Sequence, residues 1–109
     1  MKSALKILIV LIVLSGQALA EFDPLTITSL KLWLDGADNS TILNTLGPDV
    51  KAVNGEAVTR WKDKSGNSYH ANQLTAGNMP SYNISAKNSK GGVVFFGATS
   101  DYLDVTNVL

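Results

Sequence analysis

The sequence predicts an all-β domain preceded by a short leader. Throughout residues 21–109, short apolar runs alternate with clusters of Gly, Asn, Asp and Ser, as in β-sandwiches and barrels. Gly, Asn, Ser and Thr make up 33 of these 89 residues, a composition suited to turns and strand edges. No window longer than ten residues has the apolar spacing of an amphipathic helix.

Residues 1–20 resemble a helical secretory signal peptide. Lys2 and Lys6 give the segment a positive start, and the unbroken apolar run ILIVLIVL follows directly after Lys6. Small residues at Ala18 and Ala20 then form the pattern that a signal peptidase reads. A membrane-spanning helix requires about 20 apolar residues, so we expect cleavage after Ala20 rather than an anchor. The mature protein is then secreted, periplasmic or at the cell surface, and meets the membrane only transiently during export.

The composition of residues 21–109 excludes several classes of function. Seven basic and nine acidic residues are scattered along it, so no nucleic-acid partner is expected, because phosphate neutralisation needs clustered Lys and Arg. The absence of cysteine excludes a disulfide framework, a thiolate metal site and a cysteine nucleophile. A single histidine, His70, cannot build a multi-histidine metal site.

Seven segments of the mature chain are expected to be extended. In the first, residues 26–35, alternation places Leu30, Leu32 and Leu34 on one face. The other six are shorter and are separated by turn residues. They comprise residues 41–43, 57–62, 69–74, 81–84, 92–96 and 101–105.

Three of the connecting segments are expected to be turns or loops. Asn54-Gly55 suits a two-residue hairpin loop. Residues 35–39 contain Gly36 between two aspartates that are expected to cap and solvate a turn. Residues 87–92 are expected to form a solvated loop.

Four motifs, taken in order, resemble one family. The chain reads LWLDGAD, then VTRWKDKSGN, then PSY, then GVVFFGATSDYL, over about residues 30–105. Their order and spacing are similar to the opening of a laminin-G-like jelly-roll domain of the concanavalin A-like lectin/glucanase superfamily. The pattern W-x-D-x-S-G-N in the second motif is the most specific. Phe96 departs from the family pattern, which often has Asp or Asn there.

The resemblance implies an antiparallel β-sandwich of the concanavalin A-like jelly-roll type. Such domains are about twice as long as this chain, because two sheets must pack face to face. Residues 21–109 are therefore expected to be the N-terminal part of an incomplete sandwich. Its missing C-terminal half would come from further sequence or from a partner chain.

The resemblance also implies a non-catalytic recognition module that binds carbohydrate or a cell-surface protein ligand. Retaining glycosidases need a pair of nearby carboxyl groups, and the glucanase branch carries them on one strand. The sequence has no such strand, so no enzyme activity is expected. A structural or adhesion segment of a larger surface protein, or a non-functional truncated fragment, are the alternatives.

The polar loop at residues 63–67 has two interpretations. Asp63 is placed to accept backbone N–H groups in an Asx-turn, and Gly66 can take a positive φ, which makes the loop structural. Members of the family that the chain resembles often bind calcium through Asp, Asn and main-chain oxygens. A Ca²⁺ ion takes about 6–8 oxygen ligands. The candidate Ca²⁺ ligands are Asp63, Ser65 and Asn67, with remote Asp35, Asp38, Asp101 or Asp104 supplying the rest.

Trp33 and Trp61 likewise have two interpretations. An exposed indole can stack on a sugar ring, whereas a buried indole packs the sheets. We expect both to be core residues. We expect His70 to be a surface or half-buried strand residue, because no second histidine or nearby motif accompanies it.

Overall fold

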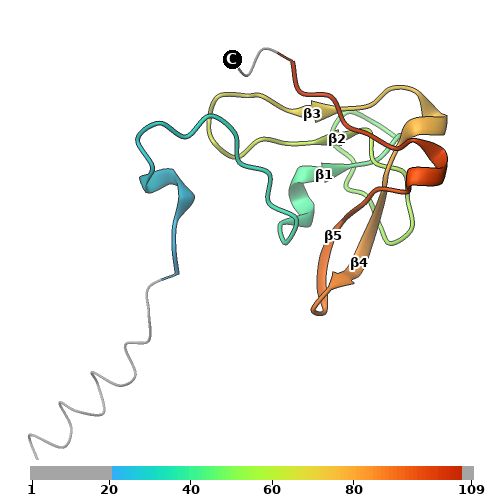
Figure 1. The fold of residues 1–109 in the computed structure, drawn as a ribbon, viewed down its shortest axis with the longest axis horizontal. Coiled ribbons are helices and arrows are strands. Elements are labelled where there is room, and N and C mark those ends of the chain that lie inside the picture. The colour runs from blue at the N-terminus through green and yellow to red at the C-terminus, as the bar shows by residue number, and fades with distance from the viewer. Residues whose placement is uncertain (1–20, 107–109) are drawn as a thin grey trace, which may run out of the picture.

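The computed structural model describes residues 21–106. The expected leader, with Ala18 and Ala20, lies outside the described residues, as do residues 107–109. Within the described part, the regular structure is mainly strand and forms two small antiparallel sheets (Figure 1). The prediction of a β-rich chain is therefore confirmed. None of the helical turns in residues 21–106 is long and apolar enough to cross a membrane.

The first sheet has the strand order β1-β2-β3. Its strands are β1 (Ile42–Leu43), β2 (Arg60–Trp61) and β3 (Ala71–Asn72). Isolated bridges from Leu43 to Lys51 and from Asn72 to Asp104 widen it on both sides. Strands expected at 41–43, 57–62 and 69–74 are thus present but shorter, while the segment expected at 101–105 contributes only the bridge at Asp104.

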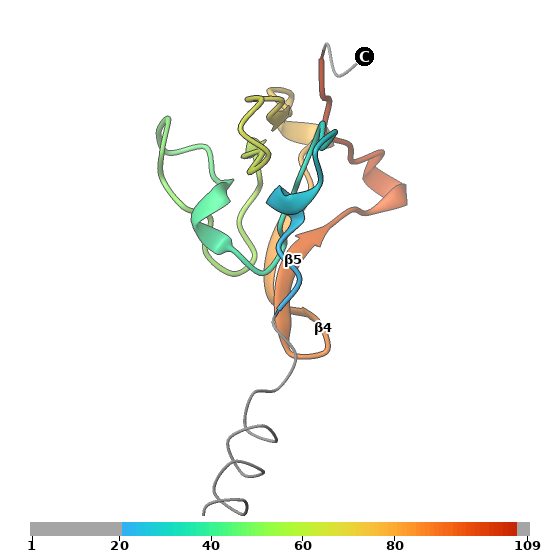
Figure 2. The ribbon, with the colours of Figure 1, turned by 90° about the vertical axis from the view of Figure 1, so that its left-hand side faces the viewer.

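The second sheet is the hairpin of β4 (Ser81–Lys87) and β5 (Lys90–Val94). It extends away from the first sheet (Figure 2). The prediction of a solvated loop over residues 87–92 is wrong, because both strands continue to a tight turn. Asn88 and Ser89 have φ of 51° and 59°, which are the positive values that a type I′ hairpin turn requires at its two central residues.

The prediction of a strand over residues 26–35 is also wrong. Its start lies in a 3-10 turn, η1 (Pro24–Thr26), which Asp23 caps by accepting a hydrogen bond from the Leu25 N–H at 2.9 Å. Further along, the Trp33 N–H donates to the Asp63 carboxylate at 2.8 Å rather than to a neighbouring strand. A side chain therefore takes the place of a strand ladder in this segment.

Short turns complete the described fold. Three further 3-10 turns are η2 (Asn39–Thr41), η3 (Ala76–Asn78) and η4 (Gly97–Thr99). The expected turn at Asn54-Gly55 is confirmed, because Gly55 has a φ of 86° and the Glu56 N–H donates to the Val53 carbonyl at 3.0 Å.

The core is small and lies where the two sheets meet. Ile42, Ala52, Val58 and Tyr82 form one buried cluster, and Trp61 packs against it with Val93. The core position predicted for Trp61 is therefore confirmed. The sheets are connected where Ala57 pairs with Ser81, while the two-layer sandwich stays a prediction.

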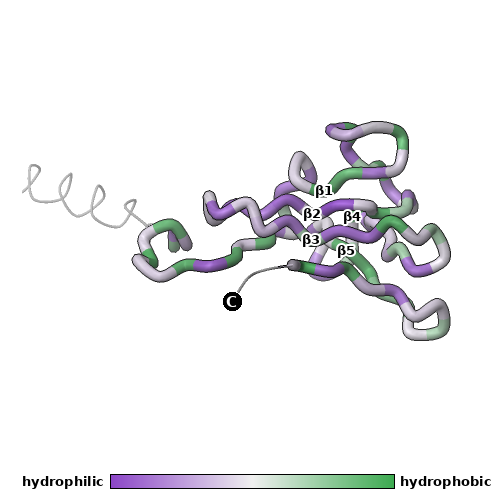
Figure 3. The backbone as a smooth tube through the Cα atoms, turned by 90° about the horizontal axis from the view of Figure 1, so that it is seen from above, coloured by the Kyte–Doolittle hydropathy of each residue, from purple (hydrophilic) through white to green (hydrophobic). Residues whose placement is uncertain are grey.

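Many large apolar side chains of the described region face solvent. Figure 3 shows apolar segments at β1 and β5 and also in the turn around η1. The exposed residues are Phe22, Leu25, Ile27, Leu46, Val50, Val53, Leu74, Ile84, Phe95, Phe96 and Tyr102. These residues are spread along the described chain from Phe22 to Tyr102.

Gly91 leaves the space that the Tyr82 ring fills. A Cβ atom at Gly91 would lie 2.5 Å from Tyr82 Oη and 3.2 Å from Tyr82 Cζ. We expect Gly91→Ala to destabilise the fold by about 1–3 kcal/mol through overpacking, measured by urea denaturation. Tyr82→Phe removes Oη, the atom closest to the added Cβ. The Gly91→Ala/Tyr82→Phe double variant should therefore lose less stability than the sum of the two single losses. Additive losses in the two variants would contradict this account.

Candidate functional site

The Asp63 carboxylate is buried and accepts four hydrogen bonds. Backbone N–H groups of Trp33 and Ser65 donate to Oδ1, each at 2.8 Å. The Tyr69 N–H at 3.1 Å and the Ser65 hydroxyl at 2.7 Å donate to Oδ2. The expected Asx-turn is therefore confirmed through the Ser65 N–H, and the same carboxylate also binds a segment 30 residues earlier in the chain.

Ser65 and Asn67 continue this contact along the same segment. The Ser65 hydroxyl lies 3.0 Å from the Lys31 carbonyl oxygen. The Asn67 side-chain amide donates to the carbonyls of Leu30 and Lys31, both at 3.0 Å. We call the contacts of Asp63, Ser65 and Asn67 with residues 30–33 the Asp63 clasp.

Burial and hydrogen bonding act in opposite directions on Asp63. Burial by itself raises the pKa of the carboxyl. The hydrogen bonds from Ser65, Trp33 and Tyr69 together outweigh it, so the pKa lies below its ordinary value of 3.8. The neighbouring backbone N–H of Asp63 donates to His70 Nδ1 at 3.0 Å. His70 is half-buried, as expected, but lies directly before β3 and not in a strand.

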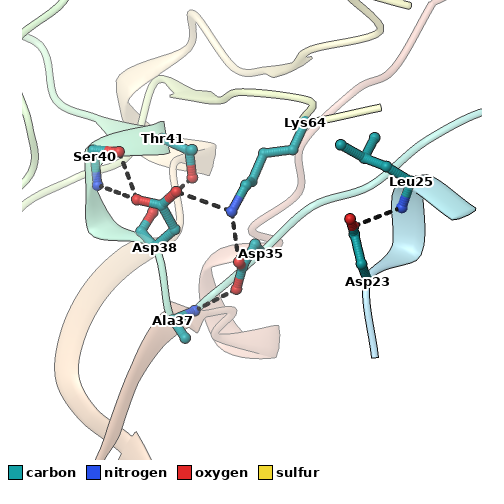
Figure 4. A network of polar contacts seen from close by, with 8 residues as sticks. All are labelled: Asp23, Leu25, Asp35, Ala37, Asp38, Ser40, Thr41 and Lys64. Carbon is teal, nitrogen blue, oxygen red and sulfur yellow. Dashed lines mark hydrogen bonds and ion pairs between the residues drawn. The ribbon is translucent and has the colours of Figure 1, made fainter. Parts of the chain in front are cut away.

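Lys64 lies between two aspartates (Figure 4). Its Nζ is 2.8 Å from Asp35 Oδ2 and 3.0 Å from Asp38 Oδ2. The same ammonium lies 4.5 Å from the centre of the Trp33 ring, within the range of a cation–π interaction. The clasp sets this geometry, because the Lys64 N–H also donates to the Trp33 carbonyl at 2.8 Å.

Asp35 caps the turn that contains Gly36, as predicted, whereas Asp38 caps η2, and both pair with Lys64. Asp35 accepts a hydrogen bond from the Ala37 N–H at 3.0 Å, and Asp38 accepts one from the Ser40 N–H at 3.2 Å. The Lys64 ammonium lowers the pKa of Asp35. The hydrogen bond from the Ser40 hydroxyl has the largest effect in lowering the pKa of Asp38, and Lys64 has the next largest. Both carboxylates raise the pKa of Lys64.

A surface hollow of about 370 Å³ adjoins this network. Trp33, Asp35 and Lys64 line it from one side, and Phe22 with its neighbours lines it from the other. Trp33 is half-buried, lines the hollow and lies outside the core cluster, so the core position expected for it is not confirmed. The hollow combines two aromatic rings with charged groups of both signs.

The candidate calcium ligands come together without forming an ion cage. Each oxygen of Asp63 already accepts two hydrogen bonds, and the Asn67 amide group donates to backbone carbonyls. No cluster of three or more His, Cys, Asp or Glu side chains suited to a metal occurs in residues 21–106. The arrangement does not fit a calcium ion unless these hydrogen bonds are exchanged, so calcium binding stays a prediction.

Three of the four remote carboxylates named with that prediction, those of Asp35, Asp38 and Asp101, have other partners in this structure. Asp35 and Asp38 pair with Lys64. Asp101 accepts hydrogen bonds from the Phe96 N–H and the Thr99 hydroxyl, which closes the turn around η4. The backbone of Asp104 pairs with Asn72.

Among the residues that line the hollow, only Trp33 and Asp35 were singled out from the sequence, and Lys64 and Phe22 are the informative omissions. Lys64 lies inside the W-x-D-x-S-G-N motif at a variable position, so the motif gives it no role. Phe22 stands isolated near the expected mature N-terminus. The sequence does contain opposite charges, Lys64 and the two aspartates on either side of Gly36. Their separation of more than 25 residues means that local spacing cannot show that they are in contact.

Comparisons with protein-family models, with curated proteins and with solved structures found no match to this chain.

We expect Asp63→Asn to cost about 2–3 kcal/mol at neutral pH, because the amide group cannot accept all four hydrogen bonds and the buried donors lose their partners. Urea denaturation measures the loss. Asp104→Asn is the matched control, because its exposed carboxylate accepts no side-chain hydrogen bond within residues 21–106. The control should change stability by less than about 0.5 kcal/mol.

The same account fixes the sign of the pH dependence. The folded-state pKa values of Asp35, Asp38 and Asp63 lie below 3.8, so the unfolded chain takes up protons first as the pH falls. Stability should be level above about pH 5 and should decrease as the pH falls below about 4. Asp63→Asn should flatten this decrease. An unchanged slope, or equal losses in the Asp63 and Asp104 variants, would contradict the role given to Asp63.

Proposed function

We propose that this protein is a secreted or cell-surface, non-catalytic recognition module, and that carbohydrate is the ligand class its hollow suits best. The observation that carries the proposal is the lining of the hollow beside Trp33. Two aromatic residues and charged hydrogen-bonding groups line a space of about 370 Å³ there, and polar groups placed in such a space fix the orientation and specificity of a small ligand.

The chemistry of the lining matches a sugar. Trp33 and Phe22 give the hollow apolar aromatic surface, and the C–H face of a pyranose can pack against such surface. One face of the Trp33 ring is already covered by the Lys64 ammonium, so Phe22 is the more accessible of the two rings. Asp35 offers carboxylate oxygens to sugar hydroxyl groups. Lys64 has three ammonium protons, and its contacts with Asp35 and Asp38 engage two of them, which leaves one for a ligand.

The proposal includes the fold that the resemblance implies. Residues 21–106 supply two small antiparallel sheets and a shared core, as the N-terminal part of a laminin-G-like sandwich would. Calcium would bind the clasp only if Asp63 exchanged N–H donors for the ion. A calcium requirement is therefore not a necessary part of the proposed function.

An adhesion or structural segment of a larger surface protein is the second candidate. It is supported by the exposed apolar side chains, among which Leu74 is 88% exposed and Leu46 is 76% exposed. Such groups suit an interface that another protein layer covers. Binding of purified glycans separates the two candidates, because a purely structural segment has no need of a sugar site.

The test uses a glycan array followed by affinity measurements on the glycans that bind. We expect Phe22→Ala to weaken binding about tenfold, which corresponds to about 1.4 kcal/mol. Phe96→Ala is the matched control. Phe96 is also an exposed phenylalanine, with 54% of its surface accessible against 70% for Phe22, and it lies outside the hollow. Absence of any glycan binding, or equal effects of the two substitutions, would overturn the proposal.

A further inference from the structure

We propose a second carbohydrate-binding surface on the solvent face of the first sheet, for an extended and electrically neutral glycan. The surface consists of Arg60, Asn72, Leu74, Tyr102 and Asp104, and we call it the polar face. The ligand class rests on the proposed function, whereas the location rests on separate residues.

The strand register builds the polar face. Arg60 on β2 lies directly opposite Asn72 on β3, and Asn72 lies opposite Asp104 across the isolated bridge. Residues directly opposite one another in an antiparallel sheet project from the same face. The adjacent row, in which Trp61 lies opposite Ala71, projects from the other face toward the core. The row therefore presents a cation on β2, an amide on β3 and a carboxylate at the Asp104 bridge. Its fourth member, Leu43 on β1, lies opposite Arg60 and is buried, so the solvent-exposed part begins at Arg60.

Two hollows adjoin along this row. One of about 220 Å³ is lined by Asn72, Leu74, Tyr102 and Asp104, among others. The other, of about 130 Å³, is lined by Arg60, Asn72 and Leu74 together with Gly47, Pro48 and Thr59. Because Asn72 and Leu74 line both, the hollows meet at these side chains. A linear ligand could occupy both, with one unit on each side of Leu74.

The functional groups of the polar face divide into fixed and free ones. Arg60 Nε donates to Asn72 Oδ1 at 2.7 Å, and the Asn72 amide donates to the His70 carbonyl at 2.9 Å. These bonds hold the centre of the row in place. Within residues 21–106, the terminal guanidinium nitrogens of Arg60, the Asp104 carboxylate and the Tyr102 hydroxyl have no hydrogen-bond partner in the protein.

The free groups favour a neutral polyhydroxylated ligand. A guanidinium donates to pairs of oxygens and a carboxylate accepts from hydroxyl groups, so the two ends of the row complement the vicinal hydroxyls of a sugar. Tyr102 is 48% exposed and offers a ring face for stacking. The opposite charges of Arg60 and Asp104 favour no net charge on the ligand.

The polar face and the hollow beside Trp33 share no lining residue. Titration of the isotope-labelled protein with cellohexaose, laminarihexaose and maltohexaose, followed by ¹H–¹⁵N NMR, reports on both at once. We expect at least one hexasaccharide to shift the Asn72 side-chain amide and the Leu74 backbone amide. The matching disaccharide should bind at least about tenfold more weakly, because it fills one hollow only.

Tyr102→Ala and Asp104→Asn should each weaken the binding at the polar face at least about fivefold, whereas Phe96→Ala should leave it unchanged. The Asp104 substitution conserves shape, so it separates recognition from folding. Shifts confined to Trp33 and its neighbours would overturn the polar face and leave the proposed function standing. Shifts confined to the polar face would support it without supporting the hollow beside Trp33. No shifts with all three sugars would overturn the polar face, while the proposed function would fall only if the glycan array also bound nothing.

Discussion

The buried carboxylate of Asp63 is the constraint on which the rest of the structure depends. A carboxylate removed from water is costly unless its oxygens are hydrogen-bonded. Asp63 meets this requirement with donors from Trp33, Ser65 and Tyr69. No strand ladder joins the segments from which these donors come. The carboxylate therefore joins them by hydrogen bonds, as backbone pairing joins neighbouring strands in a sheet.

The candidate site follows from that constraint. Once the clasp fixes residues 30–33 against the 63–67 loop, Lys64 lies over the Trp33 ring and within reach of both Asp35 and Asp38. The ion pairs then fix the turn that follows residue 35. An indole wall and charged groups of both signs meet beside Phe22 as a result. The buried core cluster contains no residue of the 30–38 segment or of the 63–67 loop, so the clasp and the ion pairs are the contacts that join these two segments.

Local patterns predicted the parts of this structure that depend on local chemistry. The Asx-turn at Asp63 and the positive φ of Gly66, which is 91°, follow from the residue types within one loop. The clasp with Trp33 does not, because its partner is 30 residues away and alternating leucines suggest a paired strand instead. The turn at Asn88-Ser89 was likewise missed, since it lacks the glycine that marks most turns of its type. The polar face requires the register of three strands, which spacing alone does not fix.

Hydrogen exchange of the Trp33 backbone amide tests the role of Asp63 most directly. The account predicts protection close to that of the Val58 amide, whose N–H donates to the Pro80 carbonyl at 2.8 Å within the core, because both amides should open only when the fold opens. Exchange of the Trp33 amide at the rate of an unstructured peptide, with Val58 still protected, would contradict the account.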